Sequence, residues 1–433
     1  MSQGLGDTFV WGTLQCCHSP AAPDVDCYVV WSLYGQAVSV GRGLDNTIII
    51  PMPYTSVHHC VIYCDPADDY KVTVKDVSSN GIWINFRKIE KYGTATLKHG
   101  DILSLGTDRT AQGPNEHHHY IFQLSDSIPA PSVTNKSLVV RDFEIVRVLG
   151  HGGFGHVHMA RRRAAPHDLV AIKQLNKVKC GLPASASSGH PNGTYVEQAM
   201  KEILNQQRAH VQRDNSSDND ILRIYEFFYE LDGSFNIVME LAAGGSLTNY
   251  IKKHEDGLAE NEAKYFAYQI CDVVHFLHTM PNPITHRDLK PDNVLLTTDI
   301  PPRIKLADFG MAHDGTHNIQ YPCGSRAFFA PEMRTGEGTY DYRADIYSVG
   351  CLVFSMLTKR MVFRPSSQQS AITGPDSDCE EDRHVEWSAL AKKGVSFEGR
   401  NFVEGLMAFL PEERMSLEMA LLHAWFADVV KLD

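Results

Sequence analysis

His286-Arg287-Asp288-Leu289-Lys290-Pro291-Asp292-Asn293 is the stretch that decides the fold of this 433-residue chain. It brings a carboxylate, an ammonium group and an amide close together along the chain. Asp288 can accept the proton of an attacking hydroxyl group, Lys290 can steady a phosphate, and Asn293 can help to hold a metal ion. Such an octapeptide rarely occurs by chance, so the sequence predicts phosphate chemistry at this point.

Three further motifs follow toward the C-terminus. Asp308-Phe309-Gly310 comes directly after a predicted strand, and Asp308 offers the hard oxygen ligands that Mg²⁺ prefers. Ala330-Pro331-Glu332 closes the segment that Asp308 opens, and Arg414 is placed to pair with Glu332. Arg343–Gly350 begins a predicted helix, in which Asp345 supplies a negative charge near the N-terminus, where the helix dipole favours it.

A glycine-rich loop lies between two predicted strands on the N-terminal side, Gly150-His151-Gly152-Gly153-Phe154-Gly155-His156-Val157. Glycine lets backbone N–H groups approach a phosphate, although such loops also form plain turns. Lys173 ends the apolar run Val170-Ala171-Ile172-Lys173, from which it can reach the α- and β-phosphates of a nucleotide. A carboxylate on a helix has to hold this lysine, and Glu202 is the preferred partner, with Glu197 as the alternative.

Together these motifs resemble the eukaryotic protein kinase family over residues 141–426. The resemblance implies a two-lobed α+β domain that binds ATP in its cleft and uses Mg²⁺, and Lys290-Pro291-Asp292-Asn293 is of the serine/threonine type. It makes Met239 the gatekeeper and places Glu240 and Leu241 in the hinge that contacts adenine. Catalytic roles are implied for Asp288, Lys290, Lys173, Asn293 and Asp308, of which Asn293 and Asp308 are the metal ligands. Nucleotide binding is implied for Leu149, Gly150, Gly152, Gly155, Val157, Ala171, Lys173, Glu202, Met239, Glu240, Leu241 and Leu295.

The same resemblance raises questions of regulation and specificity. Arg287 beside Asp288 implies an enzyme that is switched by a phosphate, and Thr316 is our hypothesis for the residue that accepts it. Cys323-Gly324-Ser325 replaces the commoner Gly-Thr pair, so Ser325 must supply the hydroxyl group. Ser246 stands where many relatives with basic substrates carry Glu, which weakens the case for arginine upstream of the phosphoacceptor.

Residues 8–124 form a separate β-rich region, because short runs of β-branched and aromatic residues alternate there with turn signals. Its loop motifs are Gly41-Arg42-Gly43, Ser56-Val57-His58-His59 and Ser78-Ser79-Asn80-Gly81. They resemble the forkhead-associated (FHA) domain, an all-β sandwich that reads phosphothreonine. By that resemblance Arg42 and Ser56 contact the phosphate and Asn80 bonds the peptide backbone, while Val57 stands where many relatives have Lys or Arg.

Residues 125–140 are rich in Pro, Ser and Asn, a composition typical of an extended linker. An FHA domain followed by a kinase domain is similar to the DNA-damage checkpoint kinase group. That similarity implies protein substrates, docking on phosphothreonine-containing proteins and self-association. Two alternatives stay open: a pseudokinase scaffold that only binds phosphopeptides, and a kinase outside damage signalling.

Composition limits the environment of the protein. The formal net charge of −12 argues against a dedicated nucleic-acid binder. No apolar run reaches the ~18 residues that span a bilayer, and the start MSQGLGDTF lacks the features of a secretory signal. The ten cysteines contain no CxxC pair, so reduced thiols are expected. The sequence therefore predicts a nuclear or cytoplasmic protein with no direct contact to nucleic acid or membrane.

Three local segments are expected to be loops. His117-His118-His119 is interpreted as a solvated loop rather than a metal site. Gly181–Gly193 cannot bury a core and is predicted to be a flexible loop. Pro365–Asp382 is polar and ends in an acidic run, so it is interpreted as a solvated loop.

Overall fold

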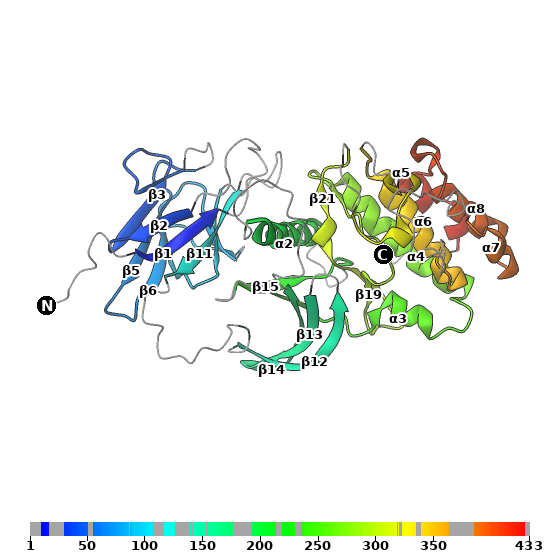
Figure 1. The fold of residues 1–433 in the computed structure, drawn as a ribbon, viewed down its shortest axis with the longest axis horizontal. Helices are drawn as coiled ribbons and strands as arrows, with labels where there is room; N and C mark the ends of the chain where they lie inside the picture. The colour runs from blue at the N-terminus through cyan, green and yellow to red at the C-terminus, as the bar shows by residue number, and fades with distance from the viewer. Residues whose placement is uncertain are drawn as a thin grey trace, which may run out of the picture. The chain divides into compact units, whose positions relative to one another are not determined.

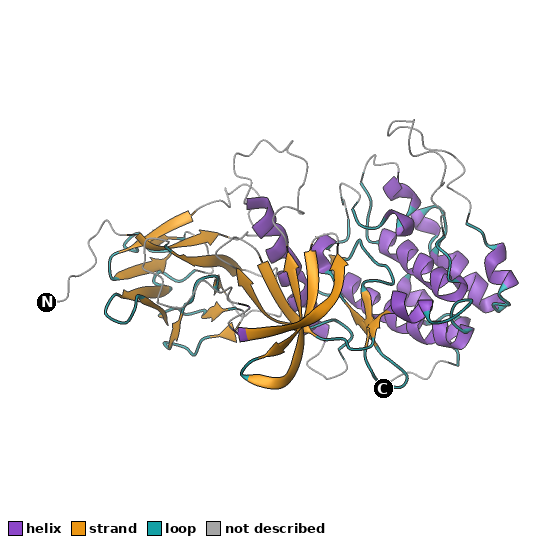
Figure 2. Cartoon of the chain, turned by 60° about the horizontal axis from the view of Figure 1, so that its bottom comes forward, coloured by secondary structure: helices purple, strands orange, loops and turns teal. Residues whose placement is uncertain are grey.

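The computed structural model divides into two compact units, one of residues 1–200 and 224–241 and one of residues 201–223 and 242–433. Figure 1 shows the ribbon coloured along the chain, and Figure 2 distinguishes strands from helices. Of the predicted loops 181–193 and 365–382, only Gly193 is described, and most of the predicted linker 125–140 also lies outside the described residues. The described residues are 10–16, 30–50, 55–85, 87–106, 117–125, 139, 142–152, 155–175, 193–213, 219–229, 235–317, 319, 323–334, 339–362 and 385–428.

The N-terminal region is built from two β-sheets (Figure 1). Neighbouring strands are antiparallel except for β3 and β4, which run parallel. In spatial order, the first sheet contains β2 (Val30–Tyr34), β1 (Val10–Cys16), β11 (His117–Leu124), β10 (Ile102–Gly106), β7 (Ile82–Ile84) and β8 (Arg87–Lys88). The second contains β4 (Ile48–Ile49), β3 (Ala37–Gly41), β5 (Cys60–Asp65), β6 (Lys71–Asp76) and β9 (Thr94–Thr96).

One apolar core joins these two sheets. Trp11 and Phe122 come from the first sheet, Val40, Ile62 and Val74 come from the second, and all five belong to a single buried cluster. Along β6 buried residues alternate with more exposed ones, as expected for a strand with one face in a core. The predicted all-β sandwich is therefore confirmed.

The triple-histidine segment is part of strand β11, so its interpretation as a loop was wrong. Pairing with β10 places His119 opposite Ser104, where it is buried and its Nδ1 lies 2.7 Å from the Ser104 hydroxyl. The apolar run Tyr120–Phe122 that follows is also buried, so the histidines continue a strand that the core already requires. Within the described ranges, no cluster of three or more His, Cys, Asp or Glu side chains could hold a metal ion.

A third sheet follows in the chain, and helix α2 (Gly193–Arg213) lies between two of its strands in sequence. Its strand order places the strand that carries Lys173 in the centre, next to the strand that ends at Glu240. A small core lies against it, including Phe143, Val170 and Val238. The five antiparallel strands are, in spatial order, β12 (Phe143–Gly152), β13 (Gly155–Arg162), β14 (Ala165–Leu175), β16 (Phe235–Glu240) and β15 (Ile224–Tyr229).

In the remaining described chain, helices make up most of the regular secondary structure (Figure 2). Its helices are α3 (Leu247–Lys252), α4 (Glu260–Thr279), α5 (Pro331–Arg334), α6 (Arg343–Thr358), α7 (Ser388–Lys392), α8 (Phe397–Leu406) and α9 (Leu417–Leu421). Short 3₁₀ turns are η1 (Phe309–Met311), η2 (Arg326–Phe328), η4 (Pro411–Glu413) and η5 (Ala424–Phe426). Five short strands form two small sheets: β17 (Gly245–Ser246), β19 (Val294–Leu296) and β20 (Ile304–Leu306) in one, β18 (Ile284–Thr285) and β21 (His313–Asp314) in the other.

Helix α6 is the centre of this unit, because every residue from Ala344 to Thr358 is buried. A helix that is apolar all round has to be enclosed on all sides, and α4 and α8 both pack against it. The β-sandwich is followed by a region of mixed α and β structure, which includes parts of both units. This arrangement confirms the predicted fold class.

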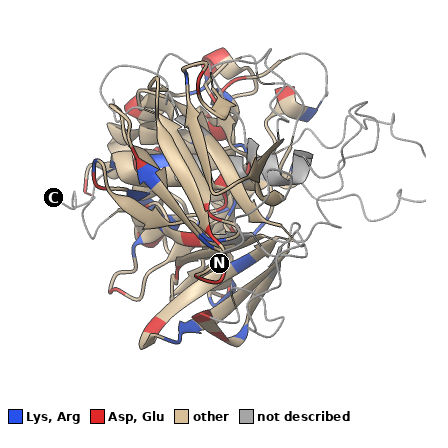
Figure 3. Ribbon diagram, turned by 90° about the vertical axis from the view of Figure 1, so that its left-hand side faces the viewer, with Lys and Arg blue, Asp and Glu red and all other residues tan. Residues whose placement is uncertain are grey.

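No helix among the described residues is both long and apolar enough to cross a membrane. In the view of Figure 3, basic and acidic residues are interspersed over the described ribbon.

Glu260, at the start of α4, links three separate segments. Its Oε2 accepts a hydrogen bond from the Ser396 N–H (3.0 Å), and its Oε1 accepts bonds from the Ser396 hydroxyl and from Trp425 Nε1 (2.8 Å). Burial by itself raises the pKa of this carboxyl, but the bonds from Ser396 and Trp425 outweigh it, so the pKa of Glu260 lies below its ordinary value. Glu260 is therefore ionised in the folded protein over a wider pH range than in the unfolded chain.

We expect Glu260→Gln to lower the free energy of unfolding by about 1–3 kcal/mol at pH 7, because hydrogen bonds to a charged group are lost. A depressed folded-state pKa gives stability that is present above the unfolded pKa of about 4.3 and is lost as pH falls through the folded pKa. The difference between wild type and variant should therefore shrink below about pH 4. Calorimetric unfolding at several pH values measures this, with Glu404→Gln, an exposed residue of α8, as the control. Equal destabilisation by both variants would contradict the assignment.

Candidate functional sites

Asp345 positions the loop that carries the octapeptide His286–Asn293. It lies fully buried in α6, and it accepts hydrogen bonds from the backbone N–H groups of His286 (2.7 Å) and Arg287 (2.8 Å) and from His278 Nε2 (2.9 Å). Burial alone raises the pKa of this carboxyl, but these donors outweigh it and hold the pKa below its ordinary value. Arg287 has a positive φ of 67°, a strained conformation for a side-chain-bearing residue, and the bond to Asp345 helps to hold it there.

His286 is a neutral part of the same loop. Complete burial lowers the pKa of its ring, despite the nearby Asp345, Asp288 and Asp308. Its Nε2 lies 3.2 Å from the carbonyl oxygen of Ala307, which can only accept, so Nε2 carries the proton. Its Nδ1 then accepts from the Asp288 N–H at 3.4 Å. The ring therefore bridges the two segments that contain Asp288 and Asp308.

Asp288 lies at the centre of a polar cluster and is only 7% exposed. Its Oδ2 accepts hydrogen bonds from Lys290 Nζ (2.7 Å) and Asn293 Nδ2 (3.0 Å), and its Oδ1 accepts one from the Ser325 N–H (2.9 Å). The predicted residues Asp288, Lys290 and Asn293 are therefore in direct contact. The carboxylate is held by three donors, so its direction is set before any substrate arrives.

Asn293 and Asp308 fit the role of metal ligands. Asn293 donates its two amide hydrogens to the carbonyl oxygen (2.8 Å) and the carboxylate of Asp288, which leaves Oδ1 as its only atom for a cation. Pairing of β19 with β20 and a bond from the Ala307 N–H to the Asn293 carbonyl (2.9 Å) place Asp308 one residue beyond that contact. Asp308 has left-handed backbone geometry (φ 64°). An amide oxygen and a carboxylate are hard ligands, so this donor set fits Mg²⁺.

Glu202, on α2, is 4% exposed. Its Oε2 lies so close to Gly310 that a side-chain carbon at Gly310 would be only 3.1 Å from it and 3.2 Å from Asp308 Oδ1. The glycine of Asp308-Phe309-Gly310 therefore leaves room for two carboxylates.

Leu295 lies in β19, opposite Lys305 of β20.

Ser325 is part of the same polar cluster as Asp288 and Lys290. Its hydroxyl accepts a hydrogen bond from Lys290 Nζ (2.8 Å), while its N–H is bonded to Asp288. Gly324 has φ +105°, and a side-chain carbon there would approach the Arg287 carbonyl to 2.5 Å. Ser325 therefore occupies the position of the hydroxyl that the sequence requires, and only glycine fits before it.

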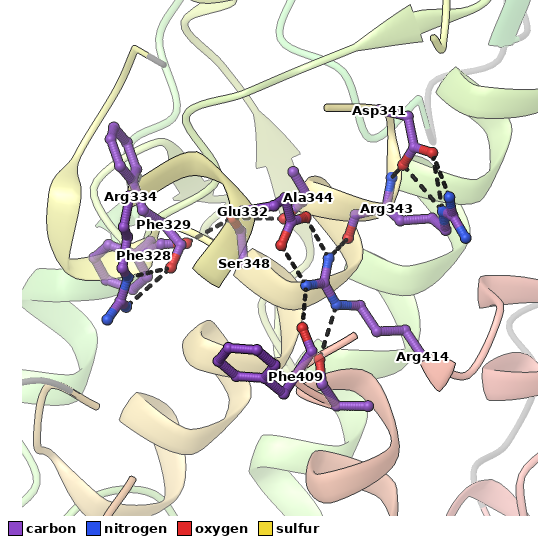
Figure 4. A network of polar contacts seen from close by, with 11 residues as sticks. Phe328, Phe329, Glu332, Arg334, Asp341, Arg343, Ala344, Ser348, Phe409 and Arg414 are labelled. Carbon is purple, nitrogen blue, oxygen red and sulfur yellow. Dashed lines mark hydrogen bonds and ion pairs between the residues drawn. The ribbon is translucent and has the colours of Figure 1, made fainter. Parts of the chain in front are cut away.

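The pairing of Arg414 with Glu332 is confirmed (Figure 4). Arg414 Nη1 and Nη2 lie 2.7 Å and 2.6 Å from the two carboxylate oxygens, an arrangement that gives a strong bidentate contact. Arg414 also donates to the carbonyl of Arg343 (2.9 Å) at the start of α6. The Arg414 side chain has no exposed surface, so the position and the orientation of its guanidinium group are fixed.

The other predicted nucleotide-binding residues lie on the five-stranded sheet. Strand register places Gly150 opposite Val157, Val157 opposite Lys173, and Ala171 opposite Met239. Ala171, Lys173 and Met239 are each at most 8% exposed, whereas Leu149 is 37% exposed. Gly152 pairs with Gly155, Glu240 ends β16, and Leu241 follows it. Gly153 and Phe154, at the tip of the glycine loop, lie outside the described residues.

At one end of the sandwich, the loops with Arg42 and Ser56 are bonded side by side. The N–H groups of Arg42 and Gly43 donate to the carbonyls of Ser56 (2.8 Å) and Val57 (2.9 Å). A side-chain carbon at Gly41 would overlap the Val57 carbonyl, which explains the glycine. Arg42 is exposed, and its Nε donates to the Thr55 carbonyl at 3.2 Å. The guanidinium is therefore oriented but still accessible to solvent.

The loop with Asn80 joins the same site. The Ser79 N–H donates to the Ser56 hydroxyl (3.0 Å), which keeps its own hydrogen for another acceptor. Buried His59 accepts from the Ser56 N–H (2.9 Å) through Nδ1 and donates from Nε2 to the Gly81 carbonyl (3.0 Å). Burial lowers the pKa of His59, which matches this neutral tautomer. The predicted residues Arg42, Ser56 and Asn80 thus lie on three loops, and the loop of Ser56 is bonded to each of the other two.

Thr316 lies on a segment that is also fixed by hydrogen bonds. Its carbonyl accepts from the Tyr342 N–H (2.8 Å), and its hydroxyl lies 2.7 Å from His317 Nδ1. Arg287 donates to the Met311 carbonyl (2.6 Å) and to the Tyr340 hydroxyl (3.3 Å). The guanidinium therefore has partners without Thr316, whose role as a phosphate acceptor stays a prediction.

Sequence reasoning missed the main role of Asp345, which it treated only as a charge near a helix N-terminus. The sequence holds one signal for it: Asp345 is the single acidic residue in the otherwise uncharged stretch Ala344–Thr358. An isolated carboxylate in such a helix has to find buried donors.

Two protein-family models match this chain, one over the sandwich and one over the region that contains the Asp288 cluster. The family model described as "Protein kinase domain" matches residues 143–426. The chain belongs to the protein kinase family. The family model described as "FHA domain" matches residues 38–106, so this kinase-family chain also carries an FHA domain.

Three relatives of this kinase-family chain each align with more than four fifths of it. It is 28% identical over 405 residues to the serine/threonine-protein kinase cds1 of Schizosaccharomyces pombe, covering 90% of this chain and 81% of the relative. It is 28% identical over 403 residues to the serine/threonine-protein kinase RAD53 of Saccharomyces cerevisiae, covering 83% of this chain and 45% of that protein. It is 27% identical over 366 residues to the serine/threonine-protein kinase chk-2 of Caenorhabditis elegans, covering 82% and 69%.

We expect Ser325→Ala to lower kcat about tenfold, because Lys290 loses one of its two acceptors and a hydrogen bond to a charged group is worth roughly 1.5 kcal/mol. Ser325→Thr keeps the hydroxyl and should retain most of the activity. Steady-state phosphate transfer to a generic protein substrate measures both. Full activity of the alanine variant would show that the Lys290–Ser325 contact is unimportant.

Proposed function

We propose that this chain is an active serine/threonine kinase, which transfers the γ-phosphoryl group of ATP to serine and threonine hydroxyls of proteins. The cluster around Asp288 is the observation that carries the proposal. One carboxylate contacts a lysine that can steady a phosphate and an asparagine that can bind a cation. Phosphoryl transfer needs positioned charges more than covalent chemistry, and this cluster supplies them.

Each residue has a defined role in this proposal. Asp288 orients the attacking hydroxyl and accepts its proton, while Lys290 steadies the γ-phosphate. Asn293 Oδ1 and Asp308 hold Mg²⁺, which when bound neutralises charge on the phosphates. Lys173 binds the α- and β-phosphates and is held by Glu202. The backbone of Gly150, Gly152 and Gly155 approaches the phosphates.

The adenine is assigned to the apolar and hinge residues. Leu149, Val157, Ala171 and Leu295 enclose the ring, Met239 is the gatekeeper, and Glu240 and Leu241 contact the ring edge. Burial of Ala171 and Met239 supports this, because ring binding requires dry apolar walls.

A pseudokinase scaffold is the second candidate function. Against it, Lys173, Asp288, Asn293 and Asp308 are all retained, and the bonds that orient Asp288 and Asn293 are intact. The structure therefore favours the enzyme.

Asp308→Ala should reduce phosphate transfer at least about a hundredfold, because a charged ligand of the phosphate-bound metal is lost. Asp299→Ala removes an exposed aspartate of the same unit and should leave activity unchanged. Transfer from Mg·ATP to a generic substrate measures both. Activity retained in Asp308→Ala, or absent from wild type, would favour the scaffold instead.

We further propose that the FHA domain docks this kinase on phosphothreonine-containing proteins. The exposed guanidinium of Arg42 and the hydroxyl of Ser56 are suited to phosphate oxygens, and Asn80 is assigned to the peptide backbone. Docking of one copy on a phosphorylated second copy would give self-association.

Arg42→Ala should weaken binding of a degenerate phosphothreonine-peptide library about 10- to 100-fold, because charge-assisted bonds to phosphate are lost. Phosphorylation of a small peptide should be unaffected. Arg87→Ala, which removes another exposed arginine of the sandwich, is the control. Fluorescence polarisation measures the binding, and an unchanged affinity in Arg42→Ala would refute its assignment.

The setting we propose is DNA-damage and cell-cycle checkpoint signalling in the nucleus or cytoplasm. The FHA-plus-kinase arrangement and the similarity to cds1, RAD53 and chk-2 support it. Activation by a phosphate on Thr316 belongs to the same proposal, and full activity of Thr316→Ala would count against it.

A further inference from the structure

Arg326 follows directly after Ser325, the residue whose N–H is bonded to the Asp288 carboxylate. It begins the 3₁₀ turn η2, and its side chain is exposed. The Arg326 side chain therefore starts one residue beyond the N–H group that contacts Asp288, the carboxylate that receives the phosphoacceptor hydroxyl in the proposed reaction.

The backbone that carries Arg326 is fixed. The Ser348 hydroxyl of α6 donates to the Phe328 carbonyl (2.8 Å), and Arg334 donates twice to the Phe329 carbonyl (3.2 and 3.0 Å) (Figure 4). Within the turn, the Phe328 N–H is bonded to the Ser325 carbonyl. A turn fixed in this way holds the backbone of Arg326 at a constant distance from Asp288, as a specificity residue requires.

Arg326 differs from its arginine neighbours because it has no partner among the described residues. Arg287 is bonded to Met311 and Tyr340, Arg343 to Asp341, and Arg414 to Glu332. No hydrogen bond or ion pair of the Arg326 side chain occurs in the part of the chain that the structure describes. Its guanidinium therefore has no visible part in holding the fold, and its five donors are available to a ligand.

A guanidinium prefers carboxylate and phosphate groups, to which it can donate two parallel hydrogen bonds. We propose that Arg326 selects protein substrates in which a residue directly beside the phosphoacceptor carries a carboxylate or a phosphate. The inference rests on the proposed kinase activity and adds the substrate class. Because Arg326 is exposed, its contribution is modest and depends on ionic strength.

The test uses full-length protein, Mg·ATP and peptides with one serine acceptor. The residue before or after the acceptor is varied among Ala, Gln, Glu, phosphoserine and Lys. We expect kcat/KM for Glu to exceed that for Gln about fivefold at one of these two positions, mainly through KM, because an ion pair stabilises bound substrate and transition state alike. A larger preference for phosphoserine than for Glu would identify phosphate as the better ligand, and the reverse would identify the carboxylate.

Variants of Arg326 separate charge from structure. Arg326→Ala should bring the Glu/Gln ratio to about one, Arg326→Lys should retain part of it, and Arg326→Glu should turn the preference toward Lys. Raising the salt concentration should reduce the wild-type ratio. Arg360→Ala, which removes another half-exposed arginine of the same unit, should leave the ratio as in wild type.

The outcomes distinguish the inference from the function on which it rests. If wild type phosphorylates none of the peptides, the proposed kinase activity fails. If it phosphorylates them with a Glu/Gln ratio near one, or if the ratio survives in Arg326→Ala, the kinase stands and Arg326 is only a solvated surface arginine.

Discussion

The buried carboxylate of Asp345 is the constraint on which the catalytic unit depends. A charge in an apolar helix is unfavourable unless donors surround it, and His278 and the backbone N–H groups of His286 and Arg287 supply donors to the Asp345 carboxylate. Satisfying that charge therefore fixes the loop, including the left-handed backbone of Arg287, which costs roughly 1–2 kcal/mol. The direction of Asp288 follows from this arrangement.

A second set of contacts fixes the segment that follows Gly324 to the same helix. Ser348 binds the Phe328 carbonyl, and Arg414 links Glu332 to the first residue of α6. Ser325 then connects this segment to Asp288 and Lys290. The loop that carries Asp288 and the segment that follows Gly324 thus share one support, so their spacing is set by a single rigid element rather than by two independent ones.

The local chemistry of the site could be read from the sequence, whereas its support could not. Asp288, Lys290 and Asn293 are close in the chain, and a short loop has to bring them together. The pairing of Arg414 with Glu332 was also predicted, although the two residues are 82 positions apart. Asp345 was underestimated because its donors are distant backbone N–H groups, and His119 was misread because pairing with β10, rather than composition, makes that segment a strand.

The contact between Arg414 and Glu332 also bears on the order of synthesis. The two residues are 82 positions apart, and the arginine comes second. While the ribosome is still making the intervening chain, Glu332 is without the cation that the finished protein provides, and the segment around it lacks its tie to α6. The N-terminal sandwich, by contrast, is complete once β11 has emerged. A nascent chain would therefore fold its FHA domain well before its kinase domain can fold completely.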